Sequence, residues 1–164
     1  MRLMNRLMLY SFGGWLIEEI YQWVLTGSFG KPNFLLGPFK PMYGIAAVLL
    51  LAVKPLGRKA FFFFAQAIPL GVEYLSGIWL KYAFGLQYWD YSEYRYNIDG
   101  LVCMKFALAW VGLSYLFAYG LQPKLAERKI TLHSSGKCML GLLQLEYLAD
   151  ICYAVIWRWG GMIG

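Results

Sequence analysis

The sequence alternates between long apolar segments and short polar ones. A helix of about 18 or more apolar residues is long enough to cross a bilayer. We expect membrane-spanning helices over residues 7–26, 38–54, 60–84, 101–121 and 137–157. The second is the shortest, because its regular apolar part lies between two prolines and covers only about 18 Å of a roughly 30 Å core. The pattern predicts an all-α, polytopic helical bundle with about five transmembrane helices, built as a single integral membrane domain over residues 1–164.

Residues 27–41, GSFGKPNFLLGPFKP, interrupt the helical pattern. Three glycines and three prolines exclude a regular helix here. Phe34, Leu35, Leu36 and Phe39 are nevertheless too apolar for an ordinary hydrated loop. Irregular backbone is tolerated at membrane depth where it is buried in protein or lines a cavity. We therefore expect a re-entrant or interfacial segment. The short helix after it either borders a binding region or is simply a packed short helix.

Residues 87–100, QYWDYSEYRYNIDG, are the most polar stretch of their length between two long apolar segments. Their aromatic residues alternate with acids, an amide and an arginine. We expect this loop to cover, or to form the mouth of, a polar interior. Its tyrosines and tryptophan would then either stack on a ligand cation or anchor the loop at the lipid headgroups.

Polar residues in the first apolar segment follow one line. Ser11, Trp15, Glu18 and Gln22 are separated by four, three and four residues, which places them on one face of a helix. A charged group at the centre of a bilayer costs several kcal/mol on most scales. This stripe should therefore face protein or a water-filled cavity.

Carboxylates outnumber basic residues inside the predicted spans. The acids are Glu18, Glu19, Glu73, Glu146 and Asp150, whereas Lys105 is the basic residue placed well inside a span. Either some carboxyls are protonated, because burial raises the pKa of an acid, or a cation or cationic ligand supplies the missing charge. The alternative is that each acid is neutral or paired with Trp, Tyr or Gln as interhelical glue.

Composition agrees with a membrane protein, since 60% of the residues are hydrophobic and 15% are charged, far from the average of soluble domains. The net charge of +6 comes from lysines and arginines in short loops, which is a topology signal. It predicts a cytoplasmic N-terminus and a C-terminus outside, with residues 87–100 outside. Without a basic face or a known motif, the charge gives no reason to expect a nucleic-acid partner.

Motifs of common enzymes are absent from the sequence. Three cysteines without paired spacing and one histidine cannot form a zinc set, so we expect free buried thiols. The sequence has no phosphate-binding loop and no G-x-S-x-G, H-E-x-x-H or C-x-x-C motif. We therefore favour a protein that is not an enzyme, with no catalytic residue, metal site or cofactor assigned.

Four stretches carry a family resemblance: SFGGWLIEEIY, FLLGPFKPMYG, VEYLSGIWL and YWDYSEYRYNIDGLVCMKFALAW. They resemble the CmpB-like, type IV ABC-transporter permease family of bacterial membrane proteins. The resemblance covers residues 11–110, with Asp150 as a later match, while Lys40 and Lys105 lie outside the family's pattern. The matching positions are Gly14, Trp15, Glu18, Gly37, Pro38, Pro41, Tyr43, Gly44, Glu73, Tyr74, Trp89, Asp90, Tyr91, Ser92, Asn97, Gly100, Cys103, Phe106 and Trp110. The resemblance implies a transporter component in the bacterial plasma membrane, with an ATPase partner supplied in trans.

The leading hypothesis is a permease-like subunit that binds a cation, a proton or a cationic small molecule in an intramembrane cavity. Besides the bilayer, its expected partners are an ATPase or another membrane subunit and further copies of the chain. One alternative is a structural or regulatory subunit of a membrane complex. Another is an intramembrane enzyme acting on a lipid, with Glu18, Glu73 and Asp90 as acid–base groups. The predicted ligand-binding residues are Trp15, Glu18, Tyr43, Glu73, Trp89, Asp90, Tyr91, Asn97 and Asp150.

Overall fold

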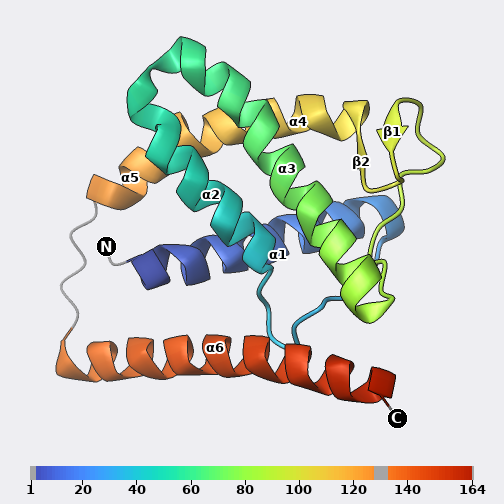
Figure 1. The fold of residues 1–164 in the computed structure, drawn as a ribbon. Helices are drawn as coiled ribbons and strands as arrows, with labels where there is room; N and C mark the ends of the chain where they lie inside the picture. Colours follow the sequence, from blue (N-terminus) through green and yellow to red (C-terminus); the bar gives the residue numbers. More distant parts are fainter. Residues whose placement is uncertain (1–2, 128–132, 164) are drawn as a thin grey trace. The chain divides into compact units, whose positions relative to one another are not determined.

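The computed structural model describes residues 3–127 and 133–163, and most of them are helical (Figure 1). Helices α4, η2 and α5 follow one another without a break, and two short strands precede them. The fold is therefore all-α, as predicted. The elements are α1 (Leu3–Thr26), α2 (Pro41–Val53), η1 (Lys54–Leu56), α3 (Arg58–Phe84), β1 (Asn97–Ile98), β2 (Val102–Cys103), α4 (Met104–Tyr115), η2 (Leu116–Leu121), α5 (Gln122–Glu127) and α6 (Ser134–Ile163).

Three helices in the described part of the chain are long and apolar enough to cross a membrane. They are Arg58–Phe84, Met104–Glu127 and Ser135–Gly160. The helix Pro41–Leu56 is apolar but shorter, as its bounding prolines predict. Three of the five expected spans thus have matching helices by length and composition, and the crossings over residues 7–26 and 38–54 stay predictions.

The chain divides into two compact units, which are residues 1–44 with 131–164, and residues 45–130. In the first unit α1 contacts α6, and residues 27–40 form no helix. The core of this unit is Leu35, Phe39, Tyr147 and Ala154. The rings of Phe39 and Tyr147 meet edge to face with centroids 4.9 Å apart. Leu35 and Phe39 of the irregular segment are therefore core residues packed on α6, and Phe34 is partly buried against them, whereas Leu36 is exposed.

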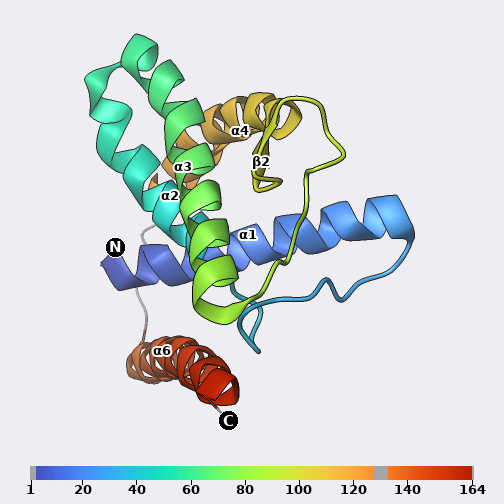
Figure 2. The ribbon, with the colours of Figure 1, turned by 45° about the vertical axis from the view of Figure 1, so that its right-hand side comes forward.

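In the second unit, residues 45–53 of α2 lead into η1, and α3 then runs back in roughly the opposite direction (Figures 1 and 2). Gly57, with φ of 92°, completes this turn in a conformation that favours glycine. The core contains Leu50, Phe61, Ala65 and Ala118. Helix α3 also packs on α4, where the Ser114 hydroxyl donates to the Ala65 carbonyl at 3.2 Å.

An acid directly before an apolar span, as Asp99 is here, is often the N-cap of the helix that follows, but the entry to α4 is built differently. Helix α4 begins at Met104, and its N-cap is Cys103. Before it, β1 and β2 pair antiparallel with Asn97 opposite Cys103. Asp99 instead lies in the turn of this hairpin with φ of 54°, so the hairpin separates it from the helix.

The cysteines are free, as expected, but only one of them is buried. Cys103 is buried in the hairpin, whereas Cys138 and Cys152 are exposed on α6. The expectation of buried thiols is therefore correct for Cys103 and wrong for the two cysteines of α6.

Candidate functional site

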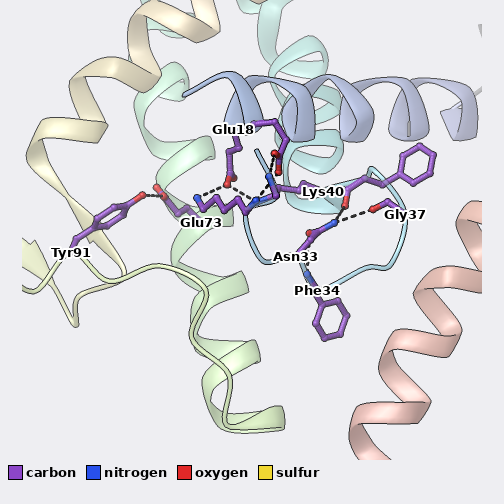
Figure 3. A network of polar contacts seen from close by, with 11 residues as sticks. Glu18, Asn33, Phe34, Gly37, Lys40, Glu73 and Tyr91 are labelled. Atoms are coloured by element: carbon purple, nitrogen blue, oxygen red, sulfur yellow. Dashed lines mark hydrogen bonds and ion pairs between the residues drawn. The ribbon is translucent and has the colours of Figure 1, made fainter. Parts of the chain in front are cut away.

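Glu18 of α1 forms ion pairs with two lysines of the irregular segment. The ammonium groups of Lys31 and Lys40 both contact Oε2 of Glu18 (Figure 3). Lys40 is buried, and the Glu18 side chain is 15% exposed. The charge of this acid is therefore compensated by the chain itself. Sequence analysis missed this arrangement, because it counted lysines inside the spans and not those of the segment folded against them.

Glu19, the next residue, holds the start of the same segment. Its Oε2 accepts the backbone N–H of Gly30 at 2.7 Å, and its Oε1 accepts that of Lys31 at 3.1 Å. The residue is buried. Irregular backbone leaves such amides without helical partners, and a buried amide without a hydrogen bond is costly. Glu19 therefore supplies the hydrogen bonds that a helix would otherwise provide.

Asp150 of α6 performs the same role at the tip of the segment. Its two oxygens accept the backbone N–H groups of Leu36 at 3.0 Å and Gly37 at 2.8 Å. An added Cβ on Gly37 would lie 3.0 Å from Oδ2 of this acid, so a glycine leaves room for the carboxylate. The sequence identified Asp150 as a candidate, and the structure places it against backbone amides.

Two further residues complete the hold on residues 27–40. The side-chain amide of Asn33 donates to the carbonyls of Gly37 at 3.1 Å and Phe39 at 3.0 Å (Figure 3). Arg158 of α6 donates to the Phe34 carbonyl at 3.0 Å, and its guanidinium lies 5.0 Å from the centre of the Phe34 ring. The segment is thus fixed at its start, tip and end, and sequence analysis named neither Asn33 nor Arg158.

Glu73 lies in the second unit, in the middle of α3, and is 4% exposed. Its carboxylate accepts a hydrogen bond from the Tyr91 hydroxyl at 3.0 Å and another from Trp110 Nε1 at 2.9 Å. Tyr91 belongs to the loop of residues 87–100, and Figure 3 shows its hydroxyl directed at Glu73. Its ring stacks on Phe106 of α4 with centroids 4.8 Å apart. Glu73 thus joins α3, the loop and α4.

Other predicted site residues of the loop contact its own backbone. Trp89 Nε1 donates to the Leu101 carbonyl at 2.8 Å. Asp90 Oδ1 accepts the Ser92 amide at 2.8 Å. Asn97 donates to the Tyr94 carbonyl at 2.8 Å and accepts the Gly100 amide at 3.1 Å. These three side chains stabilise the conformation of the loop, because they form hydrogen bonds with nearby backbone groups as side chains do in turns.

Trp15 and Tyr43 belong to the first unit. The Tyr43 ring covers Gly14, where any added Cβ would collide with it. Trp15 packs on Phe12 with ring centroids 5.8 Å apart. The polar stripe of α1 also contacts protein, since the Ser11 and Tyr147 hydroxyls lie 3.1 Å apart.

The predicted ligand set falls into both units. Trp15, Glu18, Tyr43 and Asp150 belong to the first, and Glu73, Trp89, Asp90, Tyr91 and Asn97 belong to the second. A single cavity lined by all of them stays a prediction. The residues that sequence analysis did not place in the site are Glu19, Lys31, Asn33, Lys40, Trp110 and Arg158. Two of them carried a prior signal: Glu19 as an acid inside a predicted span, and Trp110 as a position that matched the family pattern.

Comparison with curated proteins and with solved structures gives no match. A family model, described as "Putative ABC-transporter type IV", matches residues 6–155. The match extends the four stretches named above to α6, which carries Asp150 and its contacts with residues 27–40. With nearly its whole length matched, the chain belongs to this ABC-transporter type IV family of membrane proteins.

Proposed function

We propose that this chain is the membrane-embedded, permease-like subunit of a transport system in the bacterial plasma membrane, driven by an ATPase on a separate chain. The family match over residues 6–155 is the observation that carries this proposal. The given sequence carries no phosphate-binding loop, which supports a separate chain as the source of nucleotide hydrolysis.

Native mass spectrometry of the protein, extracted from its own membranes in mild detergent, tests the proposal. We expect the 18.8 kDa chain in a complex with a nucleotide-binding subunit, and the same spectrum gives the copy number of each. A complex in which every partner lacks nucleotide hydrolysis, or the chain alone at every detergent concentration, would contradict it.

For the ligand we propose a cation or a cationic small molecule that contacts the Glu73 carboxylate and the aromatic rings of Tyr91 and Phe106. Hydrogen bonds from Tyr91 and Trp110 orient this carboxylate. Aromatic rings beside a fixed negative charge are the chemistry that recognises substituted ammonium groups. Lys105 places its ammonium 4.9 Å from the Tyr94 ring and 5.6 Å from the Phe106 ring, so one cation already contacts the aromatic rings of this region.

Thermal unfolding with tetramethylammonium chloride, compared with sodium chloride, tests the ligand proposal. A ligand that binds only the folded state raises the unfolding temperature. We expect this rise in the wild type and in Glu93→Gln, which removes an exposed carboxylate of the same loop. Glu73→Gln should abolish it. Equal responses of the wild type and Glu73→Gln would contradict a site at Glu73.

A structural or regulatory subunit is the second candidate. It is favoured by the partners of Glu18, Glu19 and Asp150, which are lysines and backbone amides of the same chain. Acids used in this way hold a fold and need no ligand. This candidate predicts a complex that assembles normally but retains full transport when Glu73 is replaced by Gln.

A further inference from the structure

A basic turn in the second unit holds its cations in fixed positions. Lys54, the first residue of η1, donates from Nζ to the Ala118 carbonyl at 2.7 Å and lies 5.0 Å from the centre of the Tyr119 ring. The Arg58 guanidinium lies 5.5 Å from the centre of the same ring. Tyr115 stacks on Tyr119 and donates to the Arg58 carbonyl at 2.8 Å. Two positive groups therefore share one aromatic platform despite their mutual repulsion.

The start of α3 adds positive charge to this turn. The first residues of the helix are Arg58 and Lys59, no acid lies in the first turn, and Gly57 provides no side-chain cap. A helix N-terminus carries a partial positive charge and normally favours acidic residues. The free amides of such a terminus bind anions. Arg58 and Lys59 are therefore repelled by the partial positive charge of the helix N-terminus, and a bound anion would compensate both positive charges.

The ring platform lies on an unusual stretch of helix. Ala118 and Tyr119 belong to η2, which is π-helical over Leu116–Leu121. Short π-helical segments are rare and often occur at functional sites. The Lys54 ammonium reaches the backbone of this segment directly, so the basic turn and the irregular helix form one local structure.

Exposed apolar side chains adjoin the same turn. Leu56 is 62% exposed, Phe62 51% and Phe63 72%. Helix α3 is one of the helices able to cross a membrane, so its first turn would lie near the headgroups and the phenylalanines beside the acyl chains. We propose that Arg58, Lys59 and Lys54 bind the phosphate of an anionic phospholipid, whose acyl chains cover Leu56, Phe62 and Phe63. This assignment is independent of the transported ligand.

Native mass spectrometry of the full-length protein in detergent tests this site with added phosphatidylglycerol or phosphatidylcholine. We expect the wild type to retain phosphatidylglycerol preferentially. The double variant Arg58→Gln, Lys59→Gln should weaken this retention about 25-fold, because each basic residue near an anionic lipid surface contributes roughly a factor of five. Arg58→Lys keeps the charge but loses the planar group that stacks on Tyr119, so a smaller loss is expected.

The matched control is Lys81→Gln, Arg95→Gln, which removes two exposed basic residues from the same unit. It should keep the wild-type preference. An equal loss in this control would attribute the effect to net charge and overturn the proposal. A wild type that does not discriminate the two lipids, or displacement of the lipid by an equal concentration of inorganic phosphate, would also overturn it. Should the double variant fail to fold, the response of Arg58→Lys and the wild-type lipid preference decide the question.

Discussion

At the scale of single residues, Glu18 combines with two lysines where the sequence alone suggested a surplus of negative charge. Two ammonium groups on one carboxylate oxygen repel each other, and the acid between them makes this arrangement stable. Loss of one partner from a buried ion pair is costly because a charge is left uncompensated. The loss of folding free energy therefore depends on whether Glu18, Lys31 or Lys40 is replaced.

Glu18→Gln should destabilise the protein by about 2 to 4 kcal/mol, because it leaves Lys31 and the buried Lys40 without their shared acid. Lys40→Met should cost less, because Lys31 still pairs with Glu18. The double variant Glu18→Gln, Lys40→Met should be more stable than Glu18→Gln alone. Unfolding in detergent, followed by tryptophan fluorescence, measures all three. A double variant less stable than both single variants would show that the charges are not coupled in this way.

Two neighbouring glycines of α1 offer a second residue-scale prediction. An added Cβ meets nothing within 4 Å at Gly13 but collides with the Tyr43 ring at Gly14. Gly14→Ala should destabilise the protein by about 1 to 3 kcal/mol, the usual cost of overpacking. Gly13→Ala should be neutral or stabilising by up to about 1 kcal/mol, because alanine favours helix. Thermal unfolding of both variants tests this, and equal midpoints would show that α1 and Tyr43 do not pack so closely.

At the scale of elements, residues 27–40 owe their shape to carboxylates from two helices. Glu19 of α1 accepts the amides of Gly30 and Lys31, and Asp150 of α6 accepts those of Leu36 and Gly37. Each acid should therefore protect its own pair of amides from hydrogen exchange. The segment is thus held by hydrogen bonds to two helices although it contains no repeating structure.

Asp150→Asn should accelerate hydrogen exchange at Leu36 and Gly37, because an amide side chain cannot accept both backbone N–H groups. An unsatisfied buried donor costs about 1 to 3 kcal/mol, which corresponds to roughly a 5- to 150-fold change in local opening. Glu19→Gln should affect Gly30 and Lys31 instead. Glu127→Gln, which removes an exposed carboxylate of α5 in the other unit, provides the charge-matched control. Hydrogen exchange read by mass spectrometry distinguishes these patterns, and uniform acceleration along the segment in every variant would contradict separate anchoring.

Sequence pattern predicted the helices and the irregular segment because both depend on local signals. Runs of apolar residues mark the helices, and the glycines and prolines of residues 27–41 exclude helix there. The sequence pattern could not predict the partners of Glu19 and Asp150. These acids bind backbone amides, which are present at almost every residue and so leave no signal in the sequence. The hairpin of β1 and β2 was also missed, because it is only two residues long in each strand. The sequence therefore predicted that the site contains polar and charged residues. It did not predict the hydrogen-bond and ion-pair partners of these residues.

At the scale of the whole molecule, large apolar side chains remain exposed along several helices. On α6 alone they include Leu142, Leu145, Ile156 and Trp157. Large apolar side chains exposed in such number indicate a membrane or an interface in a stable protein. Together with the family, it makes the lipid bilayer the natural environment of this chain.

The distribution of lysine and arginine predicts how the chain crosses that bilayer, with residues 54–59 cytoplasmic and residues 87–100 outside. Labelling of intact cells with a membrane-impermeant maleimide tests this in a variant without the native cysteines. Glu93→Cys, at an exposed position of the loop, should react in intact cells. Leu56→Cys, which is 62% exposed at the basic turn, should react only after permeabilisation.

Both positions belong to the second unit and flank α3, so one crossing by this helix is sufficient to separate them. Reaction of both cysteines in intact cells, or of neither, would mean that α3 does not cross the membrane. Inverted accessibility would preserve the crossing but reverse the predicted orientation. It would also place the Arg58 and Lys59 turn at the outer leaflet, so the same experiment decides which leaflet supplies the anionic lipid proposed to bind there.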